Sequence, residues 1–241
     1  NMAFSLAEAA GGAQVLAAPR SARIRLLRVA ERAALEPDAD VAAAWASATD
    51  DGALASFSAV AYYFAERLER ELGVPVGVIQ AAYGGAVCEA FLSTQALADP
   101  RWAPLLETWE RFVREYPASP EERARVAAER RDALLAAGKV PPPWELEPKP
   151  PTHFHRPGCL FSGMVRPLVP ASLAGVLWYQ GEANGWRGHQ YRQLFPALIA
   201  ILVFLFVILE KEPRPAAFWL AGAGMGILPW FGIKYISISA V

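Results

Sequence analysis

The segment of this chain with the most chemical potential runs from Gln180 to Asn184. It holds two amides, one carboxylate and one glycine, contributed by Gln180, Gly181, Glu182 and Asn184. The segment directly follows the apolar run 175–179, which is typical of a buried strand. A strand that ends in polar residues delivers them to the carboxyl edge of an α/β sheet, where ligands bind. Such groups can orient a histidine or stabilise an oxyanion through hydrogen bonds.

The glycine pair Gly84-Gly85 is a second candidate element. It lies in a predicted tight turn at 81–86, between an apolar segment at 74–80 and a helical pattern at 89–97. Glycine permits the sharp change of direction that such a turn requires. The alternative is an ordinary turn between a strand and a helix.

Hydrophobic periodicity indicates which elements position these residues. Apolar residues at helical spacing predict a helix ending at Gly73, and residues 31–56 read as an irregular loop region. A strand, a glycine turn and a helix in succession indicate a parallel α/β architecture. The expected strands are 24–29, 74–80 and 172–179, and the expected core helices are 58–72, 89–97 and 190–200.

Residues 99–150 differ in composition from the rest of the chain. Two charged, amphipathic helical patterns at 102–116 and 120–137 are followed by Gly138 and a proline-rich stretch that ends at Pro151. This pattern predicts a helical hairpin inserted into the main fold, with a stiff return leg. His153 and His155 follow that leg, and we expect them to have a surface role.

The overall composition excludes several classes of protein. The chain has 241 residues and a net charge of −1, so nothing indicates a nucleic-acid partner. Its two cysteines, Cys88 and Cys159, lack metal-type spacing and are expected to be buried free thiols. The first residue is Asn rather than Met, which indicates residues upstream.

The last 40 residues or so have a different, strongly apolar character. Residues 194–209 carry no charge, a polar break follows at 210–215, and residues 216–233 are again uncharged over 18 positions. That length reaches the lower limit for a transmembrane helix. Two interpretations stay open: membrane helices within 201–241, or a core strand at 203–209 followed by an unrelated tail.

Residues 1–200 resemble the sialate O-acetylesterase family, part of the SGNH (GDSL-like) hydrolase superfamily. The resemblance is carried by segments that occur in the family's order. These segments are Asn1-Met2, Phe57–Phe64, Leu72–Ile79, Tyr83–Ala86 with Glu89–Phe91, Phe161–Leu168, Trp178–Asn184 and Tyr191–Pro196. The resemblance implies a three-layer α/β/α, flavodoxin-like parallel sheet, here incomplete and with the helical insertion at 99–150.

The family's reaction is the hydrolysis of an acetyl ester on a carbohydrate by a serine–histidine pair. The resemblance therefore implies an acetylated carbohydrate as substrate and no metal or other cofactor. Sialic acid and xylan-type acetyl groups both fit. Family members are typically exported, which would place the protein in the periplasm or outside the cell.

The resemblance also assigns roles within the candidate site. Asn184 matches the oxyanion-hole asparagine, and Gly84 and Gly85 match the turn whose N–H is the second donor. Glu182 would be the acid partner of the histidine, and Gln180 would contact substrate. The alternatives are a buried acid that ties loops together for Glu182, a turn-forming residue for Asn184, and a loop-stitching amide for Gln180.

Two parts of the family's pattern do not occur in this sequence. Members carry Gly-Gln-Ser-Asn-Met, and this chain has only Asn1-Met2, so the nucleophile would be the residue before Asn1. The Asp-x-His-Pro type motif does not occur, and His153, His155 and His189 do not match its position. We therefore predict that these 241 residues alone have no useful esterase activity.

Two further hypotheses remain beside a truncated acetylesterase. One is a carbohydrate-binding relative that keeps the pocket without the chemistry. The other is a membrane protein, because residues 231–240 weakly resemble helix ends of drug/metabolite (EamA-like) transporters. The tail is then either a natural membrane anchor or the product of a fusion or assembly error.

Overall fold

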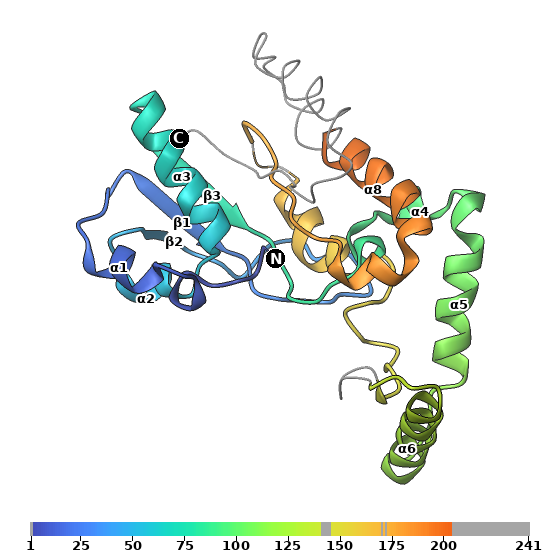
Figure 1. The fold of residues 1–241 in the computed structure, drawn as a ribbon. Coiled ribbons are helices and arrows are strands. Elements are labelled where there is room, and N and C mark those ends of the chain that lie inside the picture. The colour runs from blue at the N-terminus through green and yellow to red at the C-terminus, as the bar shows by residue number, and fades with distance from the viewer. Residues whose placement is uncertain (1, 141–145, 170, 172, 204–241) are drawn as a thin grey trace.

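The computed structural model describes residues 2–140, 146–169, 171 and 173–203 (Figure 1). The strands are β1 (Ile24–Arg28), β2 (Trp45–Ser47) and β3 (Val76–Gln80). The α-helices are α1 (Gly12–Ala17), α2 (Asp51–Ala55), α3 (Ala59–Leu72), α4 (Thr94–Leu97), α5 (Ala103–Arg114), α6 (Pro120–Ala136) and α8 (Gly188–Val203). Short 3₁₀ turns are η1 (Leu6–Glu8), η2 (Cys88–Phe91), η3 (Pro100–Trp102), η5 (Arg166–Leu168) and η6 (Glu182–Arg187), and η4 (Phe161–Val165) is a π-helical turn.

The described strands form one sheet in the order β2-β1-β3. β1 and β3 are parallel, with Leu26 opposite Val78, and α3 lies between them in the chain. This parallel pair and its connecting helix confirm the α/β class. β2 runs antiparallel to β1, so the described sheet is mixed rather than all-parallel. The difference arises in residues 31–56, which hold β2 and α2 instead of an irregular loop.

Helix α3 begins and ends where the sequence predicts. Ser58 is the N-cap and its hydroxyl accepts a hydrogen bond from the Ala61 N–H at 3.2 Å. Gly73 ends the helix in the left-handed conformation, with φ of 63°. The side chains of Tyr62 and Ala65 are buried against the sheet in a core cluster that includes η1, β1, α2 and β3.

A second core cluster supports the region of the candidate site. It joins η2, α4, η4 and α8, and its fully buried members include Leu92, Leu160, Met164, Leu194 and Leu198. Cys88 and Cys159 are buried in it as free thiols, which confirms the expectation for both. Burial raises the pKa of the Cys159 thiol to about 11.

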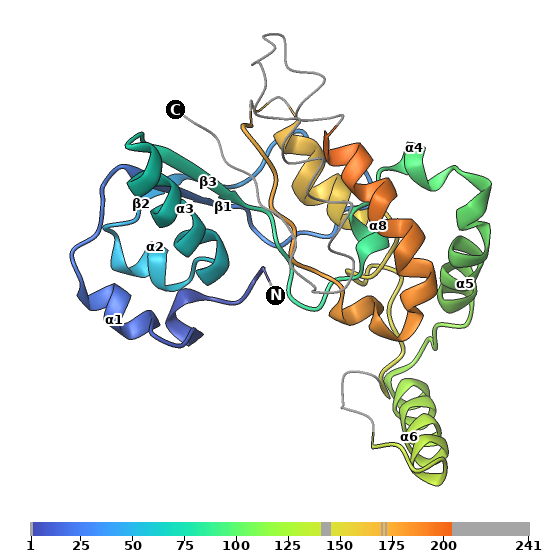
Figure 2. The same cartoon turned by 45° about the horizontal axis from the view of Figure 1, so that its top comes forward.

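The predicted insertion is present as helices α5 and α6. Both views show these two helices on the side of the molecule away from the sheet (Figure 1 and Figure 2). The predicted helix at 89–97 is divided into η2 and α4. The division occurs because Ser93 accepts a hydrogen bond from the Ala96 N–H and so caps a new helix.

The predicted strand at 172–179 does not form within the described residues 173–179. Its carbonyl groups bond elsewhere: Tyr179 O accepts from the Met2 N–H at 3.3 Å, and Gln180 O accepts from the Tyr191 hydroxyl at 2.7 Å. Among the described residues, the segment is held at its end by the N-terminal residues and by α8. It still carries Gln180–Asn184 toward the end of β3.

The apolar tail mostly lies outside the described residues, which end at 203. Both interpretations of 201–241 fall there, except for the first three positions in α8. Among the helices that the structure describes, none is both long and apolar enough to cross a membrane.

The end of β3 is tied to the start of α3 by Gln80, whose buried side-chain carbonyl accepts the Ser58 N–H at 2.8 Å. Gln80→Met keeps the side-chain length and removes this acceptor. We expect the free energy of unfolding to fall by about 1–3 kcal/mol, because a buried N–H is left unpaired. Denaturant unfolding measures the change, and Gln95→Met at an exposed position of α4 is the matched control. Equal effects of the two substitutions would contradict the assignment.

Candidate functional site

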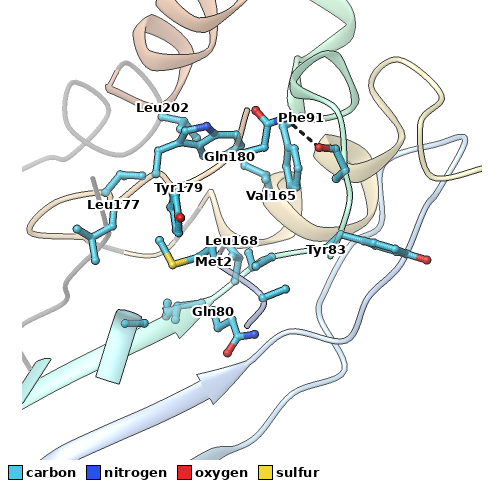
Figure 3. A pocket seen from close by; sticks show the side chains of 18 of the residues that line it. Met2, Gln80, Tyr83, Phe91, Val165, Leu168, Leu177, Tyr179, Gln180 and Leu202 are labelled. Atoms are coloured by element: carbon cyan, nitrogen blue, oxygen red, sulfur yellow. Dashed lines mark hydrogen bonds between the residues drawn. The ribbon is translucent and has the colours of Figure 1, made fainter. Parts of the chain in front are cut away.

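A cavity of about 130 Å³ lies where β3 ends. Its wall is largely apolar and combines Met2 and Ala3, the residues after β3, and the segment 176–183. Figure 3 shows Met2, Tyr179 and Gln180 around this space, with Gln80 at the end of the sheet. The predicted site segments, far apart in sequence, therefore meet at one cavity.

Asn184 is completely buried, and its carboxamide has a defined orientation. The side-chain oxygen accepts from the Cys88 N–H at 2.8 Å and from Gln180 Nε2 at 2.7 Å. Because a backbone N–H only donates, the atom facing it is the oxygen. The Asn184 nitrogen consequently faces Glu89 and donates to its Oε2 at 2.9 Å. Asn184 does not line the cavity itself but lies one hydrogen bond behind Gln180.

Glu89 is a buried member of the site's hydrogen-bond network that sequence reasoning missed. Its side chain is 5% exposed, and its Oε1 forms an ion pair with Arg187 Nη2 at 2.6 Å. Arg187 Nη1 also donates to Gln190 Oε1 at 2.7 Å. The position of Glu89 in the sequence could have indicated it. Glu89 follows the glycine turn and lies in the segment Glu89–Phe91, which carries part of the family resemblance but was assigned no role.

Gln180 bridges the two predicted halves of the site. Its Nε2 donates to Ala86 O at 2.9 Å and to the Asn184 side-chain oxygen. Both partners only accept, so the orientation of this amide is also defined. Its Oε1 is buried without a hydrogen-bond partner among the described residues. Gln180 thus lines the cavity and also joins the glycine turn to Asn184.

Glu182 and the glycine pair stand at the rim of this arrangement. Glu182 is exposed at the start of η6, and both Glu182 and Gly85 line the cavity. The buried acid that ties loops together is Glu89, not Glu182. Gly84 and Gly85 are exposed, and Gly85 adopts the left-handed conformation with φ of 74°, which favours glycine.

His155 contacts the glycine turn, contrary to the surface role expected for it. Its Nε2 lies 2.9 Å from Gly85 O, and its Nδ1 lies 2.8 Å from Lys149 Nζ. A carbonyl only accepts and an ammonium group only donates, so His155 is neutral with its proton on Nε2. Burial, and then the Lys149 charge, lower the pKa of His155 to about 4.

His153 belongs to the same cluster. Its Nδ1 accepts from the His155 N–H at 3.0 Å, and its ring stacks on Phe154. Burial, and then the neighbouring His155 and Lys149, lower the pKa of His153 to about 4. The segment that follows the helical insertion is therefore packed onto the site. Within the described part of the chain, no group of three His, Cys, Asp or Glu side chains could hold a metal ion.

These features define an α/β protein with a polar network behind a small apolar cavity. The fold matches the crystal structure of a carbohydrate acetylesterase from Xanthomonas citri, with a TM-score of 0.59 and 25% identity over 85% of this chain and 36% of that one. No family model matches the chain.

The curated relatives found are sialate O-acetylesterases. The Rattus norvegicus protein is 30% identical over 144 residues, which are 59% of this chain and 24% of the relative. The Homo sapiens protein is 27% identical over 143 residues, 59% of this chain and 20% of the relative. The matches thus span only a quarter or less of the length of these two relatives. Together the comparisons support descent from carbohydrate esterases.

The buried Glu89–Arg187 pair is expected to be important for stability. Arg187→Met should lower the free energy of unfolding by about 3–5 kcal/mol, because it leaves the Glu89 carboxylate buried without its counter-charge. Glu89→Gln should cost less, since the Arg187 side chain is 19% exposed and keeps some contact with water. Denaturant unfolding of both single variants and of the double variant gives the coupling free energy between Glu89 and Arg187.

The double variant should lose less than the sum of the single variants. Arg125→Met is the matched control, because Arg125 pairs with Glu122 and Glu129 on the exposed surface of α6. Its expected cost is below about 1 kcal/mol. Additive losses at Glu89 and Arg187 would show that the pair does not act as a unit.

The histidine cluster predicts a loss of stability in acid. The pKa of His155 is about 4 in the folded chain and about 6.5 when unfolded, so the unfolded state binds more protons between these values. Stability is therefore present above pH 6.5 and decreases toward pH 4. His155→Gln offers the same donor and acceptor without titrating, so its stability should fall less over this range.

Thermal unfolding from pH 7 to pH 4 measures this difference. His189→Gln, at an exposed position of α8, serves as the control and should follow the unaltered protein. Identical pH dependence in all three proteins would argue against the His155 contacts.

Proposed function

We propose that this chain forms the acyl-binding and oxyanion-stabilising part of a carbohydrate O-acetylesterase site of the serine-hydrolase type. The observation that carries the proposal is the single bridge made by Gln180, which joins the glycine turn to Asn184 beside one apolar cavity. Oxyanion stabilisation depends on donors that are oriented before the reaction. The surrounding hydrogen bonds supply such an orientation.

In this proposal the cavity takes the acetyl methyl group, and backbone N–H groups of Gly84-Gly85 act as donors at its rim. Asn184, buried one hydrogen bond behind Gln180, acts indirectly by fixing the Gln180 amide at the cavity wall. Glu182 orients a histidine, for which its exposed position on the rim is suitable. Gln180 Oε1 is the unpaired acceptor offered to a substrate hydroxyl.

The nucleophile in the proposed reaction is the serine of the family's Gly-Gln-Ser-Asn-Met pattern, of which this sequence holds Asn1-Met2. Met2 and Ala3 line the cavity, so the segment that matches this pattern reaches the proposed acyl pocket. That serine would attack the acetyl carbonyl while a histidine takes its proton and passes it to the departing sugar oxygen. Water activated by the same histidine would then hydrolyse the acetyl-serine and release acetate. Sialic acid and xylan-type acetyl esters are both proposed substrates, and export from the cytoplasm remains an expectation.

The 241 residues themselves contain neither the serine nor the histidine of this reaction. We expect this polypeptide to bind acetylated carbohydrate without releasing acetate. Isothermal titration with an acetylated and a deacetylated methyl xyloside should show a preference for the ester, and acetate release should stay at background. Serine-dependent acetate release would contradict the assignment.

Filling the cavity tests the acyl pocket directly. Ala81 lines the cavity, and Ala81→Leu should weaken binding of the acetylated ligand about tenfold or more by occupying the space for the methyl group. Ala133→Leu on the exposed face of α6 is the matched control and should bind normally. Equal affinity for ester and alcohol in the unaltered protein would overturn the acyl pocket.

A further inference from the structure

Trp186 is the most exposed tryptophan side chain in the described chain, at 80%. It belongs to η6, the 3₁₀ turn that begins at Glu182 and includes Asn184. Exposing a large indole to water is unfavourable, and an aromatic side chain with an apolar face suits a contact surface. The exposed indole of Trp186 is therefore a candidate contact surface for a ligand.

The geometry of η6 places Trp186 beside the cavity. A 3₁₀ helix has three residues per turn, so residues three apart lie on the same side. Asn184 and Arg187 obey this rule, since both contact the Glu89 carboxylate. By the same rule Trp186 lies on the side of Ala183, which lines the cavity, about 6 Å further along the axis.

The indole of Trp186 is also held in place. The Arg187 guanidinium carbon lies 4.7 Å from the ring centroid, within the range of a cation–π contact. Arg187 in turn is held by Glu89 and Gln190. One face of the ring thus rests on a fixed cation, while the high exposure leaves the other face open to solvent. A rigid side chain loses little conformational entropy on binding.

We infer that Trp186 is a stacking platform for the sugar ring whose acetyl group enters the cavity. The inference deepens the proposed function and depends on it. A pyranose ring presents apolar C–H groups on its faces, and these stack on the electron-rich face of an indole while apolar surface is removed from water. The platform therefore selects acetyl esters carried by a sugar ring over acetyl esters without one.

Titration with three probes tests this role. The probes are an acetylated methyl xyloside, 9-O-acetylated sialic acid and ethyl acetate, which carries the ester without a ring. Trp186→Ala should weaken binding of at least one acetylated sugar by about threefold to tenfold and leave ethyl acetate unaffected. Trp186→Tyr should restore most of the affinity, because it retains an aromatic face.

Trp45→Ala is the matched control, since Trp45 is an exposed tryptophan on β2, 42% accessible. Its sugar affinity should equal that of the unaltered chain. Tryptophan fluorescence gives a second readout: the ligand-dependent change should become smaller in Trp186→Tyr, where the contribution of Trp178 in the cavity wall remains, and should be unaltered in Trp45→Ala.

The outcomes distinguish a failure of the stacking role of Trp186 from a failure of the proposed function. If neither acetylated sugar binds the unaltered chain, the proposed function and the platform both fail. If an acetylated sugar binds equally to the unaltered chain and to Trp186→Ala, only the platform is overturned. An effect of Trp186→Ala on self-association, with sugar affinity unchanged, would make Trp186 a protein-contact residue and also overturn it.

Discussion

A buried carboxylate, Glu89, constrains most of the site. Removing a charge from water costs several kcal/mol unless partners compensate it. Glu89 meets this requirement through Arg187 and Asn184, which both lie on η6. The carboxylate consequently attaches η6 to the core and orients the Asn184 amide. This attachment also fixes the positions of Glu182 and Trp186, which are exposed residues of η6.

A second and uncharged contact supports the opposite side of the cavity. His155 follows the helical insertion and reaches the carbonyl of Gly85. Burial, together with the charge of Lys149, lowers the pKa of this histidine and keeps it neutral, so the contact is the same throughout the neutral pH range. The insertion is therefore not only a surface addition, because its return segment fixes the glycine turn. The two supports meet through Gln180, which bonds to Ala86 O and to Asn184.

The kinship with carbohydrate esterases is consistent with this arrangement. Ester hydrolysis needs donors that already point at the developing oxyanion, and water-excluding surroundings strengthen their effect. In this chain a buried hydrogen-bond network fixes the Gln180 and Asn184 amides beside a largely apolar cavity.

Local sequence by itself determined α3, β1, β3 and the helices of the insertion. Their signals are periodicity, caps and glycine, which act within a few residues of the chain. Local sequence also indicated the Gln180–Asn184 segment and the glycine pair Gly84-Gly85 as candidate parts of a site. The strand predicted at 172–179 does not form within the described residues 173–179, where the sequence shows an apolar run but not the strand that it would pair with. Only the tertiary structure decided the partners of Glu89 and His155, since these contacts join residues 95, 98 and 70 positions apart. Spacing along the chain carries no information about which buried charge or carbonyl a distant side chain will meet.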